Sequence, residues 1–109
     1  MRKLPLLLLS LIVAVLVAAC SRQSALRQAT GVTANQESAI MGALEENGVE
    51  FELINEANHN KPNITLPQGY TIYNLIDKNG NNHFLVLTAS KDFAALLDSN
   101  GTLMHGSLA

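Results

Sequence analysis

Cys20 is the residue of this chain whose chemistry can best be argued from its surroundings. It is the only cysteine among the 109 residues, so an intramolecular disulfide cannot form and the domain must fold by packing alone. Small residues lie directly before it, in the order Val17-Ala18-Ala19. The chemistry of Cys20 therefore depends on what this N-terminal segment is.

Residues 1–19 have the order of a secretory signal peptide. Arg2 and Lys3 form a short positive region, residues 6–17 are almost entirely Leu, Ile, Val and Ala, and small residues follow. The apolar run of roughly 12 to 16 residues is shorter than the about 20 residues that a membrane span needs. The segment therefore favours a cleaved leader that exports the chain from the cytoplasm.

The four residues Val17-Ala18-Ala19-Cys20 resemble the lipobox of bacterial lipoproteins, which usually begins with Leu and accepts Val. The resemblance implies cleavage before Cys20, a diacylglyceryl group on its sulfur and a further acyl chain on the new amino terminus. One acyl chain anchors only marginally, at about 0.8 kcal/mol per buried methylene, whereas two or three chains hold a protein on a membrane. Membrane lipid is thus the first expected partner, through acylated Cys20.

The residue after the cysteine bears on localisation. In lipoproteins of this kind an Asp there retains the protein in the inner membrane, and this chain has Ser21. The resemblance therefore implies a lipid-anchored protein of the cell envelope, at the periplasmic face of the outer membrane rather than the inner membrane. Two alternatives stay open, an ordinary signal peptide with Cys20 present by chance and an uncleaved N-terminal anchor.

The charge of the mature chain limits its partners. The whole chain has 7 basic and 9 acidic residues, and Arg2 and Lys3 leave with the leader, so 5 basic and 9 acidic residues remain and the net charge is −4. A mildly acidic domain lacks the basic stripe that neutralises phosphates. Nucleic acid is therefore not an expected partner.

The remaining residues with possible chemistry do not form a site. The histidines His59, His83 and His105 have no partner at helical or strand spacing. His83 and His105 each follow a similar turn and could approach on neighbouring strands, but two histidines without a clear third ligand are a weak zinc site. Ser90-Lys91 is a single adjacent pair. We expect no metal, no cofactor, no catalytic residue and no enzymatic activity.

Carboxylates occur in two patterns that also favour structure over chemistry. Asp77 and Asp98 each begin an Asp-x-Asn-Gly sequence, but a calcium loop needs Glu at its twelfth position, where Thr88 and Ala109 stand. We interpret both as turns. Glu50 and Glu52 alternate with apolar residues, which is typical of the solvent face of a strand and not of a catalytic pair.

The domain boundaries follow from composition and local patterns. Residues 20–32 comprise the lipidated cysteine and a polar, flexible tether that reaches at most roughly 40 Å, and residues 33–109 form a small globular domain. A capping box of Thr33 and Gln36 begins a helix, and Asn47-Gly48 ends it. A strand is expected over residues 49–53.

A polar loop at residues 55–69 carries the expected protein contacts. Long loops inside small domains are often functional, and we assign partner binding here to four of its residues. An alternative is that the loop is a disordered connector. The four candidate residues are His59, Asn60, Lys61 and Asn63.

The last forty residues predict a β-meander. Strands are expected over residues 70–77 and 83–88, and the second, apolar on both faces, should be central in its sheet. The Asp-x-Asn-Gly sequences echo each other and predict a further hairpin with strands near 92–97 and 102–106. A helix starting at Ser90 is the alternative.

Together these elements predict an α+β fold, with one N-terminal helix packed on an antiparallel β-meander of four to five strands. The layout, with residues 33–44 ahead of hairpins, is loosely similar to PepSY-type domains and to the small lipoprotein of outer-membrane assembly machinery. We expect a non-catalytic protein-interaction module with an envelope protein as partner. The alternatives are a peptide or small-ligand binder, including a protease inhibitor as the PepSY resemblance implies, and a phage- or toxin-defence lipoprotein.

Overall fold

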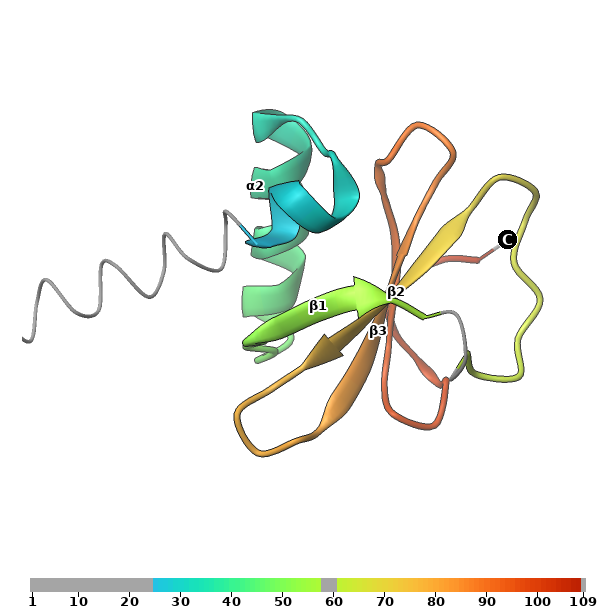
Figure 1. Cartoon of the computed structure of the whole chain (residues 1–109). Coiled ribbons are helices and arrows are strands. Elements are labelled where there is room, and N and C mark those ends of the chain that lie inside the picture. The colour runs from blue at the N-terminus through green and yellow to red at the C-terminus, as the bar shows by residue number, and fades with distance from the viewer. Residues whose placement is uncertain (1–24, 58–60, 109) are drawn as a thin grey trace, which may run out of the picture.

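The computed structural model describes residues 25–57 and 61–108. It has an α+β fold in which a five-stranded antiparallel sheet carries helix α2 (Ala34–Glu46) on one face (Figure 1). The predicted fold class is confirmed. Among the residues that the structure describes, no helix is long and apolar enough to cross a membrane.

Helix α2 begins at the predicted capping box. The backbone N–H of Thr33 donates to Oε1 of Gln36 at 2.9 Å, and the backbone N–H of Gln36 donates to Oγ1 of Thr33 at 3.2 Å. These two bonds satisfy donors that a helix N-terminus otherwise leaves unpaired. Asn47 is the C-cap and Gly48 follows with φ +68°, so both predicted ends of the helix are confirmed.

A second helical segment at residues 25–30 corrects the predicted domain boundary. Leu26 is fully buried, and Thr30 and Val32 are 4% and 7% exposed. The Nε atom of Arg27 also forms an ion pair with Oε2 of Glu37, although this oxygen receives no well-aligned hydrogen bond. Residues 25–32 therefore belong to the packed domain and not to the flexible tether, because Leu26 and Val32 supply part of its core.

The sheet is a meander in which each strand pairs with its neighbour in sequence, in the order β1-β2-β3-β4-β5. The apolar strand β3 is central, as its sequence indicates, and all of its last four residues are buried. The expected strands near 92–97 and 102–106 are present as β4 and β5, so the alternative helix from Ser90 is wrong. The bounds are β1 Leu53–Glu56, β2 Thr71–Ile76, β3 Asn82–Leu87, β4 Phe93–Leu97 and β5 Leu103–Gly106.

Strand β1 starts later than its alternating pattern predicts. Val49 and Phe51 are buried, but pairing with β2 begins only where the N–H of Glu52 donates to the carbonyl of Ile76 at 2.8 Å. Because β2 ends at Ile76, earlier residues have no strand beside them. Leu53, expected to face inward, is 54% exposed, and Ile54 is buried in its place.

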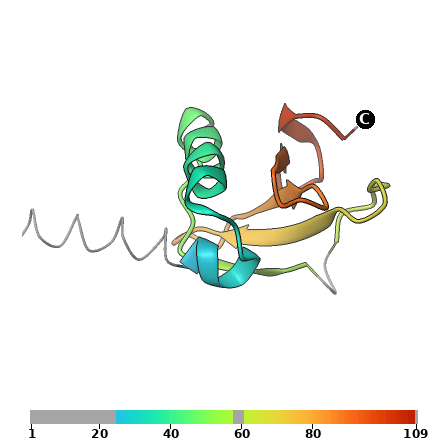
Figure 2. The ribbon, with the colours of Figure 1, turned by 90° about the horizontal axis from the view of Figure 1, so that it is seen from above.

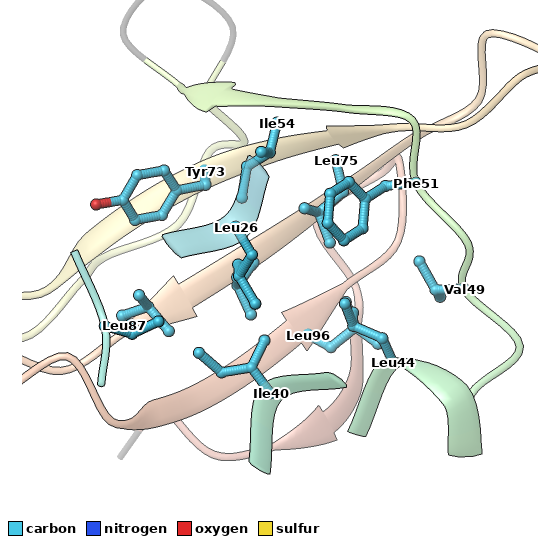
Figure 3. Close-up of a cluster of buried hydrophobic side chains, with 12 residues drawn as sticks. Leu26, Ile40, Leu44, Val49, Phe51, Ile54, Tyr73, Leu75, Leu87 and Leu96 are labelled. Carbon is cyan, nitrogen blue, oxygen red and sulfur yellow. The ribbon is translucent and has the colours of Figure 1, made fainter. Parts of the chain in front are cut away.

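Both faces of the sheet are covered. On the first face, residues of β1 to β4 pack against α2 and the segment at residues 25–32 (Figure 2). Figure 3 shows Leu26 in the middle of this cluster, between Ile54 on the sheet and Ile40 on α2. The second face has its own smaller cluster, formed by Ala57, Ile72, Phe84, Val86, Ala95 and Leu97.

The three hairpin turns of the meander share one hydrogen-bond pattern. In the β2–β3 turn the N–H of Gly80 donates to the carbonyl of Asp77 at 3.0 Å, and the N–H of Asp77 donates to the carbonyl of Asn81. The same two bonds recur in the turns that begin at Thr88 and Asp98. This pattern fits a three-residue hairpin loop whose last residue has positive φ, so the interpretation of both Asp-x-Asn-Gly sequences as turns is confirmed.

Candidate interaction site

The residues predicted to bind a partner fall partly inside the described structure. Cys20, His59 and Asn60 lie outside the described residues. Lys61 and Asn63 are both exposed and belong to the segment at residues 61–70, which lies over the second face of the sheet. The described part of the predicted contact loop therefore presents two of its four candidate residues to solvent.

The segment at residues 61–70 is packed and does not behave as a disordered connector. Ile64, Leu66 and Tyr70 pack against the cluster on the second face. Pro62 lies against the β4–β5 turn, so close that a Cβ added to Gly101 would come within 2.7 Å of the Pro62 Cβ. The alternative of a disordered connector is therefore wrong for these residues.

Packing of this segment produces a row of outward-facing polar side chains. Exposed and partly buried residues alternate from Lys61 to Leu66, as in an extended chain with one face against a surface. The exposed members are Lys61, Asn63 and Thr65. We call them the polar row; they form a preorganised surface that can donate and accept hydrogen bonds.

Beside the polar row lies a hollow of about 90 Å³. Lys61 and Glu56 bring opposite charges to its lining, and Leu66 and Tyr70 bring apolar surface. Pockets for drug-sized ligands enclose roughly 300 to 1,000 Å³, so this hollow has room for one short side chain of a partner but not for a whole cofactor.

A second hollow, of about 190 Å³, lies between the end of α2 and the β2–β3 turn. Glu50, Glu52 and Asp77 line it together with Lys78. The backbone N–H groups of Asn81 and Asn79 donate to the Asp77 carboxylate at 2.9 and 2.8 Å and lower its pKa. Asp77 is therefore engaged in holding its own turn, and Asp98 accepts the equivalent bonds from Asn100 and Thr102.

The two edges of the sheet differ in charge. Edge strand β1 ends in Glu56 and follows Glu50 and Glu52, whereas β5 has the sequence Leu-Met-His-Gly without a carboxylate or lysine. Leu103 and Met104 are 48% and 38% exposed. Natural edge strands usually carry charges that prevent further pairing, so β5 is the more open of the two edges.

The two described histidines, His83 and His105, do not come together. His83 lies on β3 and His105 on β5, and β4 runs between these strands. The ring of His105 instead lies 5.7 Å from that of Phe93. Within residues 25–57 and 61–108, no group of three or more His, Cys, Asp or Glu side chains is placed to hold a metal ion.

The structure also shows a polar feature that sequence reasoning missed. Asn74 is 4% exposed on β2, donates from Nδ2 to Oδ1 of Asn55 at 2.9 Å, and accepts from Nδ2 of Asn82 at 3.3 Å. This row of asparagines crosses β1, β2 and β3. The signal in the sequence was a single Asn between the apolar and aromatic residues of the strand Thr71–Ile76.

Comparisons with protein families, with curated proteins and with solved structures found no match to this chain.

Proposed function

We propose that this chain is a bacterial lipoprotein, anchored through acylated Cys20, whose domain is a non-catalytic protein-interaction module of the cell envelope. The observation that carries the proposal is Val17-Ala18-Ala19-Cys20 at the end of a short apolar run with a positive start. This order of residues fits the requirements of export and lipid attachment. An outer-membrane position on the periplasmic side follows from Ser21.

The surface of the domain supports the interaction part of the proposal. The polar row of Lys61, Asn63 and Thr65 is held in place by packing beneath it, and a preorganised contact surface loses less conformational entropy on binding. Edge strand β5 offers a second surface, since extended segments of partners can pair with an open edge. We assign the envelope partner to the polar row first, with His59 and Asn60 as its neighbours in sequence.

Replacing Cys20 by Ser tests the anchor. In bacteria supplied with labelled palmitate, we expect the wild-type chain to take up the label and to fractionate with the membrane. The Cys20→Ser variant should take up none and should keep its leader, because the modified sulfur is absent. A matched control is Ser21→Ala, which should be labelled like the wild type. A Cys20→Ser variant that matures to the same size and stays on the membrane would contradict the proposal.

Binding of an envelope protein can be tested with lipidated protein purified from membranes. We expect one partner at a stoichiometric ratio, and weaker capture by the double variant Lys61→Glu, Asn63→Lys, by about tenfold if the contact contributes about 1.4 kcal/mol. The control is Lys78→Glu, which changes another exposed lysine, in the β2–β3 turn. Equal capture by the double variant and the control would remove the polar row as the contact surface.

A further inference from the structure

The packing of residues 25–32 sets how far the domain can move from Cys20. The chain enters the core at Leu26, which is fully buried, and Val32 and Thr30 are buried behind it. The side-chain Oγ1 of Thr30 also donates to the carbonyl of Leu26 at 2.6 Å. The packed domain therefore reaches at least as far as Ala25, which is only five residues after Cys20.

The number of residues between Cys20 and Ala25 limits the distance between the anchor and the domain. Five residue steps span at most about 18 Å, whatever conformation they adopt, because an extended chain covers no more than about 3.6 Å per residue. A domain of this length has a radius of gyration of about 12 Å and hence a diameter of about 30 Å. The link between Cys20 and the domain is thus shorter than the domain itself.

The charges on the part of the domain nearest to this link are also compatible with a position close to lipid headgroups. Among the described residues before Glu45, Glu37 is the only carboxylate, and it is 7% exposed and paired with Arg27. Exposed side chains in this part of the chain include Arg27, Gln28 and Asn35. The ammonium group of Lys91 also lies next to Gly31. Asp92 is exposed next to the start of α2, where its Oδ1 accepts from Nε2 of Gln36. Residues 25–44 themselves therefore add no exposed carboxylate that would repel anionic headgroups.

We propose that the domain lies against the lipid surface that holds Cys20, with residues 25–31 and the start of α2 facing the phospholipid headgroups. This inference rests on the proposed lipid anchor. Figures 1 and 2 show the segment at residues 61–70, in yellow-green, at the opposite end of the domain from the short blue helical segment at residues 25–30. The polar row consequently faces away from the bilayer, where an envelope partner can reach it.

The absence of a second cysteine allows a direct test with the full lipidated chain. Single cysteines are introduced as Gln28→Cys and Asn63→Cys, both at exposed polar positions, and are labelled with the same maleimide fluorophore. The proteins are reconstituted in vesicles of phosphatidylethanolamine and phosphatidylglycerol that contain a lipid with a spin-labelled headgroup. We expect quenching at position 28 to be several-fold stronger than at position 63, and insertion of twelve Gly and Ser residues after Ser24 to reduce this difference.

Flotation of the vesicles tests the lipid anchor separately from the orientation of the domain. Wild-type protein that floats with vesicles and takes up no maleimide supports the anchor, because the sulfur of Cys20 is then blocked. Wild-type protein that stays at the bottom of the gradient refutes the anchor and the orientation with it. Protein that floats but shows equal quenching at the two positions refutes the orientation alone.

Discussion

Gly106 shows how closely the backbones of β4 and β5 approach each other. It has φ +88°, and a Cβ added there would lie 2.1 Å from the carbonyl oxygen of Ala94. We expect Gly106→Ala to lower the free energy of unfolding by more than about 2 kcal/mol, because backbone strain adds to a clash that no side chain can relieve. Urea unfolding measures this loss.

Gly42 is the matched control for that substitution. It lies inside α2, and a Cβ added there would meet nothing within 4 Å. Gly42→Ala should therefore raise the free energy of unfolding, by up to about 1 kcal/mol, through the better helix propensity of Ala. If both alanine variants shift the urea midpoint in the same direction, the described contact between β4 and β5 is incorrect.

The lowered pKa of Asp77 makes part of the stability of the β2–β3 turn dependent on pH. Backbone N–H groups of Asn81 and Asn79 donate to the carboxylate and hold its pKa in the folded chain below the ordinary value of an Asp side chain. The bonds therefore stabilise the fold above the ordinary pKa, and this contribution is lost as the pH falls through the lowered value. Asp77→Asn, which keeps an accepting oxygen, should flatten this acid dependence.

The comparison requires urea midpoints of the wild type and Asp77→Asn from neutral pH down to about pH 2. The wild type should lose more stability than the variant over the acidic part of this range. Parallel curves for the two proteins would show that the carboxylate does not contribute through these bonds.

In the three turns of the meander, Lys91 of the β3–β4 turn is the residue that fits its backbone conformation least well. Its hydrogen bonds match those of the two Asp-x-Asn-Gly turns, but Lys91 occupies the position of Gly80 and Gly101 and has φ +69°. Residues other than Gly lose about 1 to 2 kcal/mol in this conformation. Lys91→Gly should therefore raise the melting temperature, by a net gain of about 0.5 to 1 kcal/mol after the entropy of Gly is subtracted.

Lys78 provides the comparison for Lys91. It is an exposed lysine in the β2–β3 turn, and Lys91 is the only residue other than Gly with positive φ among the described residues. Lys78→Gly should lower the melting temperature. The substitution relieves no backbone strain in the folded chain, and Gly increases the conformational entropy of the unfolded chain. A destabilised Lys91→Gly variant would mean that the contact between Lys91 and Gly31 outweighs the backbone strain.

The elements that the sequence predicts correctly are those defined by short local patterns. Thr33 and Gln36 mark the start of α2, and Asp98 with Gly101 marks the last hairpin, because caps and turns need particular side chains at fixed offsets. The turn at Thr88 has no such pattern, because Lys91 stands where the other two turns have Gly, and its position follows only from the strands expected on either side. The late start of β1 also escaped, since it depends on where β2 ends and not on residues 49–53 themselves.

The candidate site is harder to predict from the sequence than the turns and the helix cap, because it depends on tertiary packing. The loop composition identified Lys61 and Asn63 as exposed, but nothing local shows that Ile64 and Leu66 hold the segment on the second face. The row of Asn55, Asn74 and Asn82 brings together residues from three strands, and its register is set by the whole sheet.

For the whole molecule, the most consequential difference between the sequence prediction and the structure is the inclusion of residues 25–32 in the core. Leu26 is fully buried in the cluster between the sheet and α2. We expect Leu26→Ala to lower the free energy of unfolding by about 2 to 5 kcal/mol, the range for a large-to-small change in a core. Urea unfolding, with thermal unfolding as a second measurement, tests this.

The neighbouring Gln28 supplies the control, because it is exposed on the same helical segment. Gln28→Ala should change stability by less than about 0.5 kcal/mol. If Leu26→Ala is as mild as Gln28→Ala, residues 25–32 do not contribute to the domain, and the short link to Cys20 loses its basis.

The strand order of the meander has a consequence for folding kinetics. Each strand pairs with the strand next to it in sequence, and β2 to β5 are joined by short turns, so most of the sheet forms through contacts of low sequence separation. Such topologies fold fast because little loop entropy is lost before contacts form. This chain has a single cysteine and therefore no intramolecular disulfide to guide its folding. It thus needs only successive hairpin closure, with the packing of α2 and residues 25–32 on β4 and its neighbours as the long-range step.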